Sequence, residues 1–161
     1  NNVENTALST WTGSANIATV GTVTSGYVGR AILDPTLSSD HTYSGITLSA
    51  PVGESVVFGD ILYMDKSEAE WKKADASVIG TMPAMCVALE SKGNGETCLM
   101  LYDGMIRDDS WSWTVDDSVQ ILYVSDTAGA LSESAGTISQ AVGLIYSATK
   151  IIWKPSLVLY E

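Results

Sequence analysis

The 161-residue sequence is poor in charge, and most of the charge it has is acidic. Charged residues make up 17% of the chain, against roughly 25% in ordinary globular proteins. The formal net charge is −11, from 19 acids and 8 bases. Nucleic acids and anionic membranes attract basic surfaces, so neither is an expected partner. No apolar run is long enough to span a bilayer, and no membrane insertion is expected.

Cysteine is also scarce, since Cys86 and Cys98 are the only two. They flank a turn at 92–95, which predicts that they lie on adjacent strands of a hairpin. Two registers are open, one with Cys98 opposite Leu89 and one with Cys98 opposite Ser91. Neither pairs the cysteines, so the sequence predicts two buried free thiols and no disulfide. Two cysteines are too few for a zinc site, and no metal or cofactor is expected.

Residue sets that carry catalysis are missing as well. His41 is the only histidine, and its neighbours Ser39 and Asp40 do not make a triad, because a triad is assembled across a fold. The sequence has no Gly-x-Ser-x-Gly elbow and no phosphate-binding glycine loop. We therefore expect a surface-loop histidine and a protein that is not an enzyme.

Paired acids occur at 108–109 and 116–117. Three interpretations are open: turn caps, the carboxyl pair of a glycosidase, or calcium ligands. The sequence has no Asp-x-Asp-x-Asp-Gly loop, so turn capping is the expected role. The chain begins at Asn1 with no signal-peptide pattern in residues 1–10, and we expect a fragment or a processed product.

Strand signals dominate what is present. Short runs rich in Val, Ile, Tyr, Thr and Trp recur at regular spacing, each bounded by Gly, Asp, Ser or Pro, as in sandwiches and barrels. The predicted strands are 55–58, 61–65, 85–89, 97–102, 110–115, 120–124, 140–146, 150–153 and 157–160. A charged stretch at 67–74 is expected to form a hairpin tip or a single helical turn. The run 98–102 is apolar on both faces, which requires two covers. We expect the chain's own core to supply one and a neighbouring chain the other.

An internal repeat marks the second half of the sequence. Residues 61–63 recur as 121–123 at a spacing of 60, and each is followed by an acidic turn and a second short strand within 69–76 or 128–135. A third strand, 84–89, recurs as 141–146 at a spacing of 57. The fold class predicted is therefore all-β, a sandwich or barrel with an internally duplicated β unit. Residues 1–45 are expected to form an extended Gly/Thr-rich segment and 46–161 the head module.

Tryptophans are the candidate binding residues. If 110–115 is a strand, Trp111 and Trp113 project from the same face. Exposed indoles would suit sugar stacking, and buried ones would belong to a core or a subunit interface; packing is the more common role. With Trp71, they form the predicted receptor or trimer interface.

Several stretches together resemble phage virion proteins. Residues 5–14 and 21–26 resemble the Thr/Gly-rich runs that precede the head of tailed-phage fibres. The pattern at 57–63, 87–89 and 95–104, closed by 122–131 through 142–144 to 153–156, resembles a β module of tailed-bacteriophage tail fibres, spikes and capsid decoration proteins. The resemblance implies a virion location, a homotrimer, contacts with other virion proteins and no catalytic residues.

Three functions follow from that resemblance. The first is a tail-fibre terminal module that contributes to host attachment through a surface glycan or receptor. The alternative is a trimeric capsid decoration protein that stabilises the phage head. The third is a glycan-processing tailspike domain. The N-terminal resemblance favours the fibre.

Overall fold

The computed structural model of the chain describes residues 33–116 and 120–160. Within these residues the protein is all-β, as predicted, and its one helical element is a short 3-10 turn, η1, at Ile79–Thr81. The nine strands are β1 Thr42–Pro51, β2 Ile61–Asp65, β3 Glu70–Lys73, β4 Cys86–Ala88, β5 Thr97–Arg107, β6 Ile121–Val124, β7 Leu131–Ser132, β8 Ala141–Ser147 and β9 Lys150–Trp153.

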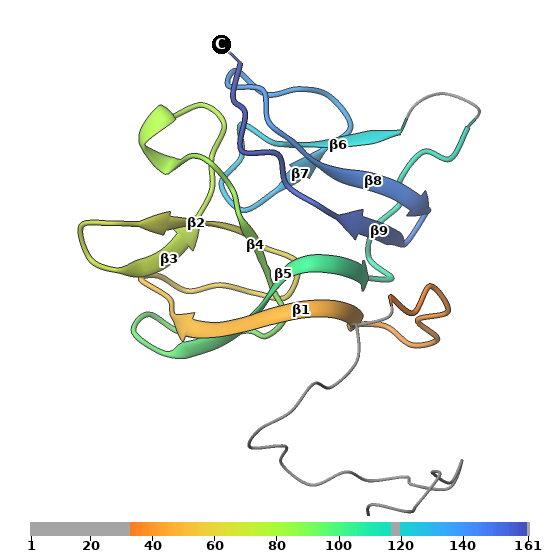
Figure 1. Ribbon diagram of the computed structural model, residues 1–161, viewed down its shortest axis with the longest axis horizontal. Helices are drawn as coiled ribbons and strands as arrows, with labels where there is room; N and C mark the ends of the chain where they lie inside the picture. Colours follow the sequence, from red (N-terminus) through yellow and green to blue (C-terminus); the bar gives the residue numbers. More distant parts are fainter. Residues whose placement is uncertain (1–32, 117–119, 161) are drawn as a thin grey trace, which may run out of the picture. The chain divides into compact units, whose positions relative to one another are not determined.

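All nine strands belong to one antiparallel sheet that curls into a half-barrel (Figure 1). The order is β3-β2-β4-β5-β9-β8-β6-β7, and β1 pairs with β5 outside this path. The long strand β5 bonds to β1 along one edge. Its other edge bonds first to β4, at Met100 and Leu101, and then to β9, from Gly104 to Arg107. Strand β5 thus joins the strands before it to the strands after it.

The predicted duplication is confirmed by strand pairing. We call β2–β5 the first half and β6–β9 the second half. In each half, the first strand pairs with the second and with the third, and the third strand pairs with the fourth. The opposite residues also correspond at the predicted spacings of 60 and 57: Tyr63 with Lys72 matches Tyr123 with Ser132, and Leu62 with Cys86 matches Leu122 with Gly143.

Two hydrophobic clusters stabilise the sheet. The main cluster draws on both halves and includes Leu101, Leu122 and Trp153, which are fully buried. The second cluster covers the other face of the first half and contains Val52, Val56, Leu62, Trp71, Cys86, Ala88, Cys98 and Met100. The expectation that a neighbouring chain covers the second face of 98–102 is therefore wrong for its buried residues Cys98 and Met100. The cover comes from this chain, because the segment after β1 folds back over the sheet.

A bulge in β5 changes which face of the strand meets the main cluster. Leu101 and Ile106 both lie in that cluster. Their odd spacing would place them on opposite faces of a regular strand. However, successive residues of β1 lie opposite Leu101 and Asp103, which leaves Tyr102 as an extra residue. The extra residue lets both parts of β5 contribute to one core.

Three predicted strands are not formed. Segments 55–58 and 157–160 contribute only single bridges, at Val56 and Tyr160, and 110–115 is irregular. A ten-residue strand, β1, was not predicted, because its sequence is small and polar. It pairs closely with β5 where Gly45 lies opposite Gly104, and a side chain on either would collide with the other backbone. The predicted boundary after residue 45 falls inside β1, and the N-terminal segment 1–32 lies outside the described residues.

The cysteine hairpin has a third register. Val87 lies opposite Leu101, which is one residue away from each of the two predicted alignments. The reason is that the loop bonds to the segment 52–56 as well as to itself: the Gly95 N–H donates to the Val52 carbonyl, and Glu96 N–H to Gly93. Both cysteines are buried and free, as predicted. The stretch 67–74 contains a hairpin tip, as predicted, with β3 following the turn.

Candidate functional site

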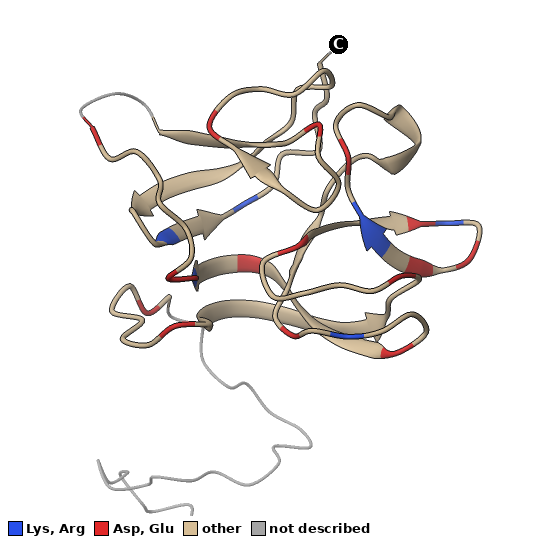
Figure 2. Ribbon diagram, turned by 180° about the vertical axis from the view of Figure 1, so that it is seen from behind, with Lys and Arg blue, Asp and Glu red and all other residues tan. Residues whose placement is uncertain are grey.

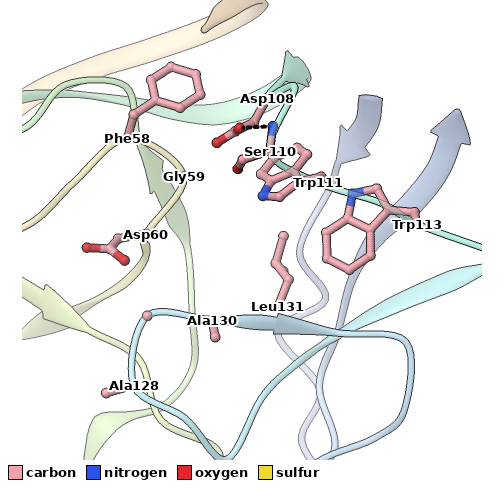
Figure 3. Close-up of a pocket in the computed structure, with 11 residues that line it drawn as sticks. Phe58, Gly59, Asp60, Asp108, Ser110, Trp111, Trp113, Ala128, Ala130 and Leu131 are labelled. Carbon is pink, nitrogen blue, oxygen red and sulfur yellow. Dashed lines mark hydrogen bonds between the residues drawn. The ribbon is translucent and has the colours of Figure 1, made fainter. Parts of the chain in front are cut away.

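A cavity of about 320 Å³ opens between three segments that are far apart in the sequence (Figure 3). They are the loop before β2, the irregular stretch after β5, and the turn between β6 and β7. Its lining combines aromatic, small and acidic residues: Phe58, Gly59, Asp60, Asp108, Ser110, Trp111, Trp113, Ala128, Gly129, Ala130 and Leu131. A volume of this size lies in the lower range of small-molecule sites.

Trp111 and Trp113 both line this cavity, although the strand predicted to carry them is absent. The stretch is shaped instead by a turn, because the Asp108 side chain accepts a hydrogen bond from the Ser110 N–H at 2.8 Å. The Trp113 N–H then donates to the Ala148 carbonyl in the β8–β9 turn. The indole centroids are 5.6 Å apart and tilted by 52°. Both side chains are half-buried against the main cluster, so each leaves part of its surface open.

One polar atom in this wall has no partner. The indole N–H of Trp113 is buried and makes no hydrogen bond among the described residues. Buried donors are almost always paired in folded proteins, and an exception calls for an explanation. An ordered water beside the indole would satisfy this donor.

Trp71, the third predicted binding residue, lies elsewhere. It is opposite Met64 in the β2–β3 hairpin and belongs to the second cluster with Val52. Only 8% of its surface is exposed. Trp71 therefore packs inside this chain, and the structure does not bring it together with Trp111 and Trp113.

Asp60 forms the opposite wall of the cavity. Its Oδ2 accepts a hydrogen bond from the Val57 N–H at 2.8 Å and lies 3.1 Å from Lys73 Nζ. The turn beside it requires glycine at position 129, since its φ is +79° and a Cβ would lie 2.8 Å from Asp60 Oδ1. Asp60 is thus held by the backbone of its own loop and by Lys73 of β3.

His41 stands beside the cavity and was predicted to be a surface-loop histidine. Its side chain is 56% exposed, and its ring stacks on Phe58 with centroids 4.2 Å apart. The structure adds what the sequence did not predict: the Asp108 and Asp40 carboxylates face the His41 ring at 3.8 and 3.7 Å. The proximity of Asp108 follows from the β1–β5 register, which sets Thr42 opposite Arg107. No sequence signal predicts that register.

Of the paired acids, Asp108 caps a turn, as predicted, and Asp117 lies outside the described residues. Asp109 pairs with Arg107, whose pKa this hydrogen-bonded carboxylate raises. Asp116 Oδ1 accepts a hydrogen bond from Gln120 Nε2 at 3.0 Å. A backbone hydrogen bond from Asp109 holds the pKa of Asp40 below its usual range.

Comparisons with known proteins give no relative to guide the interpretation. No protein-family model matches the chain, and neither a curated protein nor a solved structure is significantly similar. Among the described residues, no helix is long and apolar enough to cross a membrane.

Proposed function

We propose that this chain is a structural module of a tailed-phage virion that assembles as a trimer and contributes to host attachment by binding a surface glycan. The resemblance to fibre and decoration modules supplies the virion context. The observation that carries the binding role is the cavity at Trp111, which joins indole surfaces to the carboxylate of Asp60. A sugar ring has an apolar C–H face that packs on an indole and hydroxyls that donate to carboxylates.

The proposed trimer is supported by an apolar row on the second half. Ile121, Leu144 and Ile152 lie opposite one another across β6, β8 and β9, and with Pro155 they line an apolar groove of about 440 Å³. Leu144 is 46% exposed. Strands β6 and β8 contain no charged residue, and Figure 2 shows the acidic residues mostly in loops.

In the first half of the sheet, the corresponding apolar row is buried inside the chain. The corresponding residues there, at the same register, are Ile61, Val87 and Leu101, and all three are fully buried in the main cluster. An apolar row that is left partly exposed in this way is typical of a surface that meets another chain. We propose that other copies of this chain cover the row. Two equally acidic copies repel each other less when they meet through a face of low charge than through any other face.

The binding role is tested by screening the labelled full chain on an array of bacterial surface glycans and measuring the hits by calorimetry. We expect Trp111→Ala to weaken binding at least about tenfold, since aromatic anchors dominate such sites. The matched control is Tyr160→Ala, an exposed aromatic outside the cavity, which should bind as the unchanged chain does. Absence of any glycan hit, or equal binding by Trp111→Ala, would contradict the proposal.

The location in the particle separates the fibre from the decoration alternative. Imaging of intact particles should place the chain on the tail. A location on the shell would contradict the fibre assignment and favour the capsid decoration role.

A further inference from the structure

Three potential metal ligands converge beside the cavity. His41 Nε2 lies 3.7 Å from Asp40 Oδ2 and 3.8 Å from Asp108 Oδ2, and the three ligand atoms all lie within 4.8 Å of one another. They come from two segments far apart in the sequence, the loop before β1 and the turn after β5. The pairing of Thr42 with Arg107 brings these segments together.

The other carboxylate oxygens are already engaged. Asp40 Oδ1 accepts hydrogen bonds from the backbone N–H groups of Asp109, at 2.7 Å, and His41, at 2.9 Å. Asp108 Oδ1 accepts one from Ser110. Outer hydrogen bonds of this kind fix the orientation of metal-binding side chains. Here they leave one oxygen of each acid directed toward the imidazole.

Asp108 is the most buried of the three ligands. Its side chain is only 7% exposed, and its Oδ2 receives no hydrogen bond from the described residues. The distance of 3.8 Å to His41 Nε2 is too long for a hydrogen bond. This oxygen is therefore free to accept a cation, and a carboxylate on so buried a side chain favours a positive charge beside it.

The imidazole is also held in position before any ion arrives. His41 stacks on Phe58, and its backbone has φ +54°, a left-handed conformation that is uncommon outside glycine. Residues kept in such conformations cluster at functional sites. The stacking contact favours the orientation in which the ring faces the two carboxylates.

We infer that Asp40, His41 and Asp108 bind a divalent metal ion of the zinc class, with at least one coordination position left to solvent. Zinc takes imidazole nitrogen and carboxylate oxygen at about 2.0–2.2 Å, which places tetrahedral ligands about 3.4 Å apart. The observed 3.7 and 3.8 Å need only a small contraction. An imidazole ligand disfavours calcium, which prefers oxygen. The ion would tie the loop before β1 to the turn after β5.

Calorimetry on the metal-free full chain, titrated with zinc chloride and separately with calcium chloride, tests the inference. We expect one zinc per chain and no comparable calcium binding. His41→Gln removes the only imidazole from an exposed position, so it should fold and lose at least about tenfold in zinc affinity. Asp108→Asn should bind zinc more weakly than His41→Gln does.

The matched control is Asp103→Asn, a half-buried acid on β5 that pairs with Lys154 and lies outside the cluster. It should bind zinc like the unchanged chain. A second readout is the melting temperature, which zinc should raise in the unchanged chain and in Asp103→Asn but not in His41→Gln. No zinc binding, tighter binding of calcium, or equal zinc affinity in His41→Gln would overturn the site. None of these outcomes depends on whether a glycan binds.

Discussion

The two halves of the sheet share their strand pairing but turn opposite faces to the main cluster. Ile61, Val87 and Leu101 of the first half point into that cluster. Their counterparts at the same register, Ile121, Leu144 and Ile152, line the apolar groove on the other face. The bulge at Tyr102 in β5 is where the switch occurs. A duplicated pairing pattern therefore does not imply a duplicated core, and one half keeps an apolar face that the described chain covers only in part.

The sharpest way to break this comparison is to place the same charge at corresponding positions. Val87→Asp should abolish folding, because it buries an unpaired carboxylate in the main cluster. Leu144→Asp should keep the fold, because that side chain is 46% exposed, yet it should dissociate the proposed trimer. Circular dichroism and light scattering measure the two effects. Equal loss of folding in both variants would mean that the two rows do not differ.

The next effect concerns a buried amide that links the halves. Gln140 is fully buried; its Oε1 accepts from the Ala84 N–H, and its Nε2 donates to the Ala84 and Ser156 carbonyls. Gln140→Leu should lower the free energy of unfolding by about 2–4 kcal/mol, since it leaves buried backbone groups unpaired. Urea denaturation at fixed protein concentration measures the loss. A change below about 0.5 kcal/mol would contradict the linking role.

A smaller loss is expected where β1 approaches β5. Gly104 has φ +155°, and a Cβ there would lie 2.2 Å from the Ser44 carbonyl oxygen. Gly104→Ala should cost about 1–3 kcal/mol, because the backbones must separate. Gly80→Ala is the control, since a Cβ there meets nothing within 4 Å. Similar denaturation midpoints for the two variants would show that close approach of β1 is not required.

The smallest effect belongs to the thiols of the second cluster. Burial raises the pKa of Cys86 to about 12 and also raises the pKa of Cys98. The folded chain should therefore react slowly with thiol reagents at pH 8. The unfolded chain should react readily at both cysteines. The folded state favours the neutral thiol of Cys86. The contribution of this thiol to the free energy of unfolding is therefore complete below the unfolded pKa of 9.0 and declines as the pH rises toward about 12. Fast labelling of the native chain would show that the second cluster is open.

The sequence predicted the parts of the fold that are repeated or strongly apolar. The spacings of 60 and 57 anticipated the pairing of both halves, because a repeated apolar pattern fixes strand register. Strand β1 could not be predicted, since its pairing depends on two glycines that approach from distant segments. The change of buried face between the two halves could not be predicted either. The bulge at Tyr102 does not show in the alternation of apolar and polar residues.

The candidate site was only partly predictable for the same reason. Trp111 and Trp113 could be singled out by residue type, although their local structure was predicted wrongly. Asp108 was singled out as a turn cap, and its turn was confirmed. Its approach to His41 depends on the β1–β5 register, which is a long-range property. Residue type identifies candidates, while the pairing of distant strands decides which of them meet.

Light scattering of the unmodified full chain at micromolar concentration tests the central claim most directly. If the partly exposed row of the second half meets other copies, the mass will be three times the 17.1 kDa of one chain. A single species of 17.1 kDa would show that this row stays open to water and would contradict the account.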